Sequence, residues 1–174
     1  EIRRMDTNTL VAAAEVEAEK PKKVRVKQQP LNKYYSEDEN IVEIGVDEVG
    51  RGPLFGRVYT AAVILPKDDS FDHFKMKDSK KFTSKAKIEE AAEYIKKNAL
   101  AWHISYASEN VIDEINIRNA THRAMHEAIK GCIISNNDND NNNYKKDYHL
   151  LIDGNDFKPL IMMNNESVSL IQIQ

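Results

Sequence analysis

The chain has 174 residues, enough for one domain with a substantial hydrophobic core. Its 41% hydrophobic and 30% charged residues and its mean hydropathy of −0.61 are typical of a soluble globular protein, and no apolar run of about 18 residues predicts a membrane span. A net charge of −3 excludes a wholly basic protein, so any nucleic-acid contact must come from a local patch.

Cysteine usage favours a reducing compartment. Cys132 is the one cysteine, so no internal disulfide can form, and the N-terminal residues contain no apolar segment typical of a secretory signal. We therefore predict an intracellular protein, cytoplasmic or, in a eukaryote, nuclear. Nothing in the sequence requires more than a monomer.

Residues 1–40 differ from the rest and are predicted to be a flexible N-terminal extension. A basic run at 21–27 and an acidic run at 36–40 flank a segment that resembles the motif by which proteins bind sliding clamps. The motif residues are Gln28, Leu31, Tyr34 and Tyr35. Two interpretations stay open: a clamp-binding plug, or a linker that docks on its own domain.

The globular part begins at Ile41. Ile44 and Val46 alternate with smaller or polar residues as in a strand, and the strand delivers Asp47 and Glu48 at its end, followed by Gly50-Arg51-Gly52. Carboxylates for a hard metal ion and exposed amides for a polyanion thus lie within a few residues. Residues 57–65 predict a second, antiparallel strand.

A lysine-rich segment follows. Lys75, Lys77, Lys80 and Lys81 lie either on a solvated face or where they meet phosphates. Thr83 or Ser84 can cap a helix that extends to about Asn98.

Residues 101–107 predict a third strand, 109–115 a short helix and 118–133 a longer helix with alanines and Cys132 toward the core. His122 and His126 are four residues apart, but without a third ligand nearby they are expected to be exposed rather than metal-binding. The Asn- and Asp-rich stretch at 135–147 predicts a surface loop that contributes nothing to the core.

Residues 148–153 form a second apolar run that ends in an acid, Asp153, before Gly154. This pattern is typical of a buried parallel strand with its acid at the edge where open α/β sheets hold ligands. Residues 167–174 begin a fifth strand.

Four segments, in order, resemble ribonuclease HII, the type 2 ribonuclease H family. They are residues 47–56, 78–81, 112–117 and 151–155. The resemblance implies an α/β, ribonuclease H-like fold with a mixed five-stranded sheet flanked by helices over residues 41–174. It also implies Mg²⁺ or Mn²⁺ as cofactor and two substrates, RNA–DNA hybrids and ribonucleotide-containing duplex DNA.

The resemblance also implies residue roles. Asp47, Glu48 and Asp153 would be the metal-binding catalytic carboxylates. Gly50, Arg51 and Gly52 would recognise the ribose 2′-hydroxyl, and Lys80 and Lys81 would hold phosphates.

Two features of the family pattern are absent, a fourth catalytic Asp after the fifth strand and a later Tyr, so we expect a domain that is incomplete at its C-terminal end. Alternatives are a nucleic-acid-binding fragment without turnover, tethered to a clamp, and a dinucleotide-binding enzyme. The second is disfavoured because Asp47 and Glu48 would repel a pyrophosphate.

Overall fold

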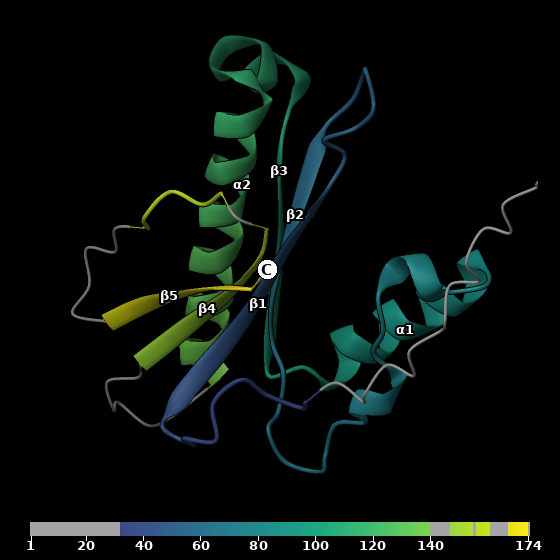
Figure 1. Cartoon of the computed structure of the whole chain (residues 1–174), viewed down its shortest axis with the longest axis vertical. Helices are drawn as coiled ribbons and strands as arrows, with labels where there is room; N and C mark the ends of the chain where they lie inside the picture. The colour runs from purple at the N-terminus through teal and green to yellow at the C-terminus, as the bar shows by residue number, and fades with distance from the viewer. Residues whose placement is uncertain (1–31, 140–146, 155, 161–166, 174) are drawn as a thin grey trace, which may run out of the picture. The chain divides into compact units, whose positions relative to one another are not determined.

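The structure is a computed structural model that describes residues 32–139, 147–154, 156–160 and 167–173. These residues form one five-stranded sheet with strand order β3-β2-β1-β4-β5 (Figure 1). The strands are β1 (Ile41–Val49), β2 (Val58–Ile64), β3 (Ala101–Ala107), β4 (Asp147–Asp153) and β5 (Ser167–Ile173). β1, β2 and β3 form an antiparallel ribbon, and β4 and β5 continue the sheet in parallel with β1. The predicted mixed five-stranded sheet is confirmed.

The strands follow from alternation of buried and exposed side chains. In β2, Val58, Thr60, Ala62 and Ile64 are buried, while the residues between them are exposed or half-buried. The same period appears at Ile44 and Val46 of β1. Because successive side chains of a strand point to opposite faces, one face of the sheet carries the core.

One long helical segment, α2 (Glu109–Asn139), crosses that face of the sheet (Figure 1). It consists of two helices that meet at Asn116, which has φ 67° and ψ 160°. The Asn116 carboxamide oxygen accepts a hydrogen bond from the Asn119 backbone amide at 3.0 Å and so caps the second helix. With ψ near 160° this backbone lies outside the left-handed helical region, in a conformation rare for any residue other than glycine. The predicted division between a short and a longer helix is confirmed here.

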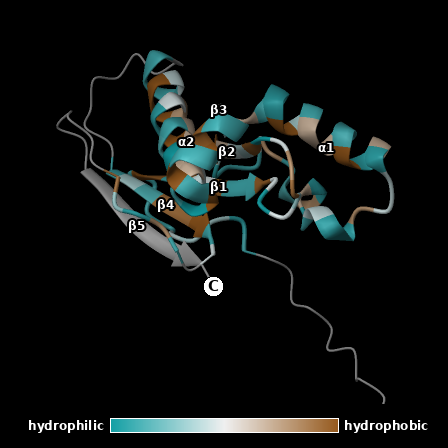
Figure 2. Ribbon diagram, turned by 90° about the horizontal axis from the view of Figure 1, so that it is seen from above, coloured by the Kyte–Doolittle hydropathy of each residue, from teal (hydrophilic) through white to brown (hydrophobic). Residues whose placement is uncertain are grey.

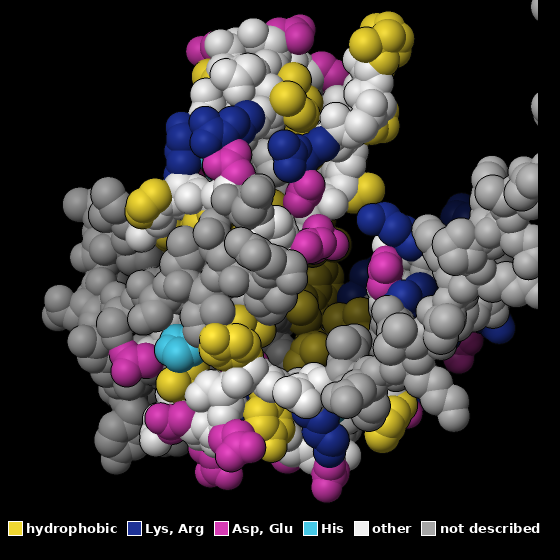
Figure 3. Space-filling view, viewed as in Figure 1, with side chains coloured by type: hydrophobic (Ala, Val, Ile, Leu, Met, Phe, Trp, Pro, Cys, Tyr) yellow, Lys and Arg dark blue, Asp and Glu magenta, His cyan; other side chains and the backbone are white. Residues whose placement is uncertain are grey.

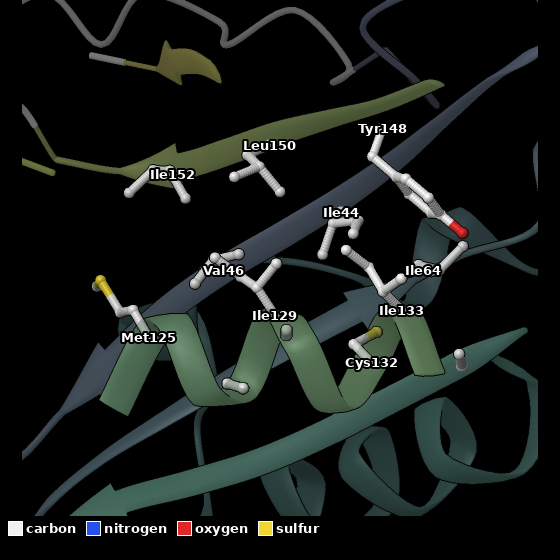
Figure 4. Close-up of a cluster of buried hydrophobic side chains, with 13 residues drawn as sticks. Ile44, Val46, Ile64, Met125, Ile129, Cys132, Ile133, Tyr148, Leu150 and Ile152 are labelled. Atoms are coloured by element: carbon white, nitrogen blue, oxygen red, sulfur yellow. The ribbon is translucent and has the colours of Figure 1, made fainter. Parts of the chain in front are cut away.

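The core lies between α2 and the sheet. Figure 4 shows Met125, Ile129 and Ile133 of α2 pointing toward the apolar side chains of β1 and β4. Hydrophobic residues likewise lie where α2 meets the strands in Figure 2, whereas the outward side of α2 is mostly hydrophilic. Ala124, Ala128 and Cys132 are buried at this contact, as their helical spacing predicts.

The second helix, α1 (Lys85–Asn98), begins where the sequence predicts, with the Ser84 hydroxyl accepting from the Lys87 amide at 3.4 Å. Tyr94 contacts the segment before the helix, because its ring lies 5.2 Å from that of Phe71 and its hydroxyl accepts from the Asp72 amide at 2.9 Å. Two short 3₁₀ helices, η2 (His73–Lys75) and η3 (Ser79–Lys81), precede it. No residue of α1 is buried.

The predicted Asn/Asp loop is wrong at its start. α2 continues through Asn139, and Asn136 is buried. The Tyr148 hydroxyl donates to the Asn137 carboxamide oxygen at 2.8 Å and accepts from the Asn136 carboxamide at 3.4 Å. These bonds to β4 extend the helix through residues of low helix propensity. Residues 140–146 of the predicted loop lie outside the described residues.

Among the described residues, no helix is both long enough and apolar enough to cross a membrane. The face of the sheet opposite α2 carries exposed aromatic and aliphatic side chains on β3 at Trp102, Ile104 and Tyr106. The strand alternation predicted for residues 101–107 is therefore confirmed, with this face turned away from α2.

Candidate active site

The two acids that end apolar strands come together at one edge of the sheet. β1 and β4 are parallel neighbours, and Val46 pairs with Ile152, so Asp47 and Asp153 occupy the next position on each strand. Both side chains are exposed, and since Val46 and Ile152 point into the core, both acids point to the opposite face. The Asp153 carboxylate makes no hydrogen bond or ion pair with another described residue, and that of Asp47 accepts only the Glu48 backbone amide, at 2.7 Å.

The third predicted carboxylate, Glu48, follows Asp47 in the strand and so points to the other face of the sheet. Its side chain is only 19% exposed and lies 3.4 Å from the Arg51 guanidinium. Glu48 therefore holds the arginine of the glycine-rich turn, while Asp47 and Asp153 keep oxygens without a cationic partner among the described residues.

The turn between β1 and β2 depends on Gly50. Its φ is +104°, and a Cβ atom there would lie 2.6 Å from the carbonyl oxygen of Arg57. Only glycine fits this close approach without strain. Gly52 is different, because a Cβ there would meet no atom within 4 Å, so the backbone is open to solvent or to a ligand.

The predicted phosphate-binding lysines lie in η3. The Asp78 carboxylate caps this short helix by accepting from the Lys80 amide at 3.0 Å. Lys80 and Lys81 are both exposed. The Lys80 ammonium group makes no bond to Asp47, Glu48 or Asp153, so among the described residues no contact brings it to the carboxylates.

The segment that follows β4 is fixed to α2 by groups that sequence reasoning missed. The Arg118 guanidinium donates two hydrogen bonds to Asp156, at 2.5 and 2.6 Å, and holds the pKa of that carboxyl below its usual value, with His122 and Arg51 acting in the same direction. The His122 imidazole lies 3.0 Å from the Asp156 carbonyl oxygen. Asp156 thereby fixes the segment after β4 to α2.

The two histidines are not the exposed pair that the sequence predicts. His122 is 4% exposed, and His126 is half-buried with its Nε2 atom 2.9 Å from the Lys158 carbonyl oxygen. A carbonyl can only accept, so each Nε2 carries a proton and donates. Burial lowers the pKa of His126, partly offset by that carbonyl. Their i, i+4 spacing places both imidazoles on one side of α2, where they bond the backbone of residues 156–158 instead of a metal ion.

The end of the clamp-like motif docks on its own domain. The Glu43 carboxylate accepts from the backbone amides of Tyr35 (3.0 Å) and Ser36 (2.6 Å). The Lys67 ammonium donates to the Ser36 and Asp38 carbonyl oxygens, each at 2.9 Å, and lies 5.7 Å from the centre of the Tyr34 ring. Tyr35 is 63% exposed, and Gln28 and Leu31 lie outside the described residues.

The donor chemistry at the strand ends fits a hard divalent cation. Mg²⁺ binds carboxylate oxygens and is often held by only one or two carboxylates together with water and substrate phosphate. Asp47 and Asp153 supply two such groups at neighbouring positions. In the part of the chain that the structure describes, no group of three or more His, Cys, Asp or Glu side chains is arranged to hold a metal ion.

A mixed sheet in order β3-β2-β1-β4-β5, with acids ending the neighbouring strands β1 and β4, defines a ribonuclease H-like protein. Among solved structures, the ribonuclease H2 of Pyrococcus horikoshii has this fold, with a TM-score of 0.52 and 16% identity over 75% of this chain and 61% of that one.

The family is narrower than the fold. The ribonuclease HII family model matches residues 44–152, and the chain belongs to the ribonuclease HII family. It is 43% identical over 120 residues to ribonuclease HII of Bacteroides thetaiotaomicron, covering 69% of this chain and 53% of that protein. It is 53% identical over 87 residues to the enzyme of Oceanobacillus iheyensis, covering 50% and 32%. The chain thus spans about half the length of the first of these relatives.

Proposed function

We propose that this chain carries the active site of a metal-dependent endonuclease of the type 2 ribonuclease H class. Its substrates would be the RNA strand of RNA–DNA hybrids and ribonucleotides embedded in duplex DNA, cut on their 5′ side. The observation that carries the proposal is the parallel register of β1 and β4, which gives Asp47 and Asp153 adjacent positions. Membership of the ribonuclease HII family supports it.

Asp47 and Asp153 would hold Mg²⁺ or Mn²⁺. Glu48, the third predicted carboxylate, would join them only after releasing Arg51 and turning toward their face of the sheet. Divalent ions held by these carboxylates, two in our proposal, would supply Lewis acidity that lowers the pKa of water and stabilises charge on a leaving oxygen. Water adds to phosphorus as the bond to the 3′-oxygen breaks, which leaves a 3′-hydroxyl and a 5′-phosphate. No nucleophilic side chain is needed.

Selectivity for RNA would come from the glycine-rich turn. Gly50 brings the backbone sharply back toward Arg57, and the open surface at Gly52 leaves room for a sugar. Backbone amides of Gly50, Arg51 and Gly52 would bond the 2′-hydroxyl, the group that distinguishes RNA from DNA. Lys80 and Lys81 are exposed and would reach phosphates of the bound duplex.

In the decisive experiment, the chain is incubated with Mg²⁺ or Mn²⁺ and a DNA duplex that contains one ribonucleotide, and the cleavage products are separated by size. We expect a cut 5′ of the ribonucleotide that EDTA abolishes. Asp47→Asn should lower the rate at least about 100-fold, since losing a few kcal/mol of metal-dependent stabilisation has that effect. Glu90→Gln, an exposed acid on α1, is the matched control and should cut normally.

Cleavage that persists in EDTA or in Asp47→Asn would refute the assignment. Binding of the duplex without any cut would favour the second candidate, a nucleic-acid-binding module without turnover. The pairing of Glu48 with Arg51 is the observation in its favour, because that pair withholds one carboxylate from a metal ion.

We also propose a sliding clamp as a protein partner, reached through Gln28, Leu31, Tyr34 and Tyr35. The exposure of Tyr35 supports it, whereas the bonds of the neighbouring backbone to Glu43 favour docking on the chain's own domain. Surface plasmon resonance of the chain over immobilised clamp tests this, with Tyr35→Ala as the variant that should lose binding.

A further inference from the structure

A cationic groove runs along α2 on the side that meets residues 156–160. It has a volume of about 350 Å³, and its charged lining among the described residues consists of Arg123, Lys130 and Lys158 against one acid, Glu127. His122 and His126 also line it. Neither the fold nor the carboxylates at the strand ends require this concentration of positive charge.

The positive charge of the groove is largely unneutralised. The Arg123 side chain makes no hydrogen bond or ion pair with another described residue, and it is exposed. Lys158 donates to the neutral carboxamide of Asn119 at 2.7 Å. Of the three cations, only Lys130 forms an ion pair with a described carboxylate, 3.4 Å from that of Glu127. In a chain of net charge −3, such a local excess within a concave surface attracts an anionic partner.

The groove borders the segment that follows Asp153 in the chain. Its floor contains the two imidazoles that hold residues 156 and 158, and Asp156 is only three positions beyond Asp153. Arg118 occupies the boundary, bonded to Asp156. Figure 3 shows Lys and Arg side chains gathered over the upper part of α2 beside Asp and Glu side chains. Arg123 and Lys130 lie two helical turns apart, about 10 Å along the axis.

We propose that this groove binds the sugar–phosphate backbone of the substrate duplex, away from the bond that is cut. The inference rests on the proposed function, since the ligand is that same substrate. A span of about 10 Å with a cation at each end suits an extended polyanion better than a single small anion. The guanidinium of Arg123, which has no competing partner among the described residues, can bond a phosphate with two parallel N–H groups.

The test measures binding without turnover. Fluorescence anisotropy of a labelled RNA–DNA hybrid would be recorded in EDTA for the wild type and for Arg123→Gln/Lys130→Gln. We expect the double variant to bind about tenfold more weakly and the slope of log K against log salt to fall by about 2, roughly one for each phosphate that is no longer neutralised. Lys96→Gln/Lys97→Gln, two lysines at the end of α1, form the matched control and should change affinity less than about twofold.

The inference is overturned if both double variants weaken binding equally, or if neither does. Glu127→Gln gives an independent check, because removing the one acid among the described lining residues should tighten binding. The outcomes separate the two proposals. A wild type that binds through the groove but never cuts refutes the proposed reaction alone, whereas one that cuts while Arg123→Gln/Lys130→Gln binds normally refutes the groove alone.

Discussion

At the scale of single residues, the turn after β1 depends on one backbone conformation. Gly50→Ala would place a methyl group 2.6 Å from the Arg57 carbonyl at a φ of +104°. We expect this change to lower the free energy of unfolding by about 1–3 kcal/mol, the usual cost of a strained backbone. Gly52→Ala, where a Cβ would meet nothing within 4 Å, should change it by less than about 0.5 kcal/mol. Urea unfolding of the two variants measures the difference, and equal losses would contradict the prediction.

The residues of the candidate site differ in how far sequence could predict them. Asp47, Asp153 and Gly50 are marked by local patterns, an apolar strand that ends in an acid or a turn that needs glycine. The burial of His122 and His126 could not be predicted, because it depends on carbonyl groups more than thirty positions away in the chain. Nothing local in a helix identifies a partner at that separation.

At the scale of elements, residues 33–38 are held against the domain by two largely buried charges. The Glu43 side chain is 11% exposed and that of Lys67 22%, and both bond the backbone of this segment. Glu43→Gln removes the charge that strengthens the hydrogen bonds from Tyr35 and Ser36. Hydrogen bonds to a charged group contribute roughly 1.5–3 kcal/mol, so we expect trypsin to cleave after Lys33 about tenfold faster.

Glu39→Gln is the control for this experiment, since Glu39 is an exposed acid in the same region that bonds no other described residue. Its cleavage should match the wild type. An unchanged rate in Glu43→Gln would mean that the segment is held by other contacts. If residues 28–35 do bind a clamp, the release of Tyr34 in Glu43→Gln should also raise the affinity for it.

The hydrogen bonds from the histidines of α2 to residues 156–158 should make the stability of the fold depend on pH. Burial lowers the pKa of His126 in the folded chain, so the unfolded chain binds its proton first. The contribution to stability is complete above the unfolded value of about 6.5 and is lost as the pH falls below it. Between pH 7.5 and 5.5 we expect His126→Gln, which keeps an N–H donor but cannot titrate, to lose less thermal stability than the wild type. Equal losses would exclude this role for His126.

Helix ends were harder to predict than helices. α1 begins at its Ser84 cap as expected, because capping is a local interaction. α2 passes its expected end at residue 133 because Asn136 and Asn137 bond the Tyr148 hydroxyl on β4. The composition of residues 136–139 favours a loop, and only a contact across the fold outweighs it.

At the scale of the whole molecule, the order of strands came from the resemblance rather than from periodicity, which cannot tell that β4 pairs with β1 instead of β3. What holds this order is the single layer of apolar contacts between α2 and the sheet, because β1, β2 and β4 all bury their inward side chains there. The site shares this support, since the acids directly follow core residues Val46 and Ile152.

Ile129 lies at the centre of this layer with no exposed surface, facing β1 in Figure 4. Ile129→Ala should reduce the free energy of unfolding by about 2–5 kcal/mol, because the methyl groups removed leave a cavity between two rigid elements. Ile134→Ala, on the same helix but 59% exposed, makes the same chemical change outside the core and should lose less than about 1 kcal/mol. Thermal and urea unfolding followed by circular dichroism compare the two. Equal losses would mean that helix propensity rather than packing against the sheet stabilises α2, and the positions of Asp47 and Asp153 would then need another explanation.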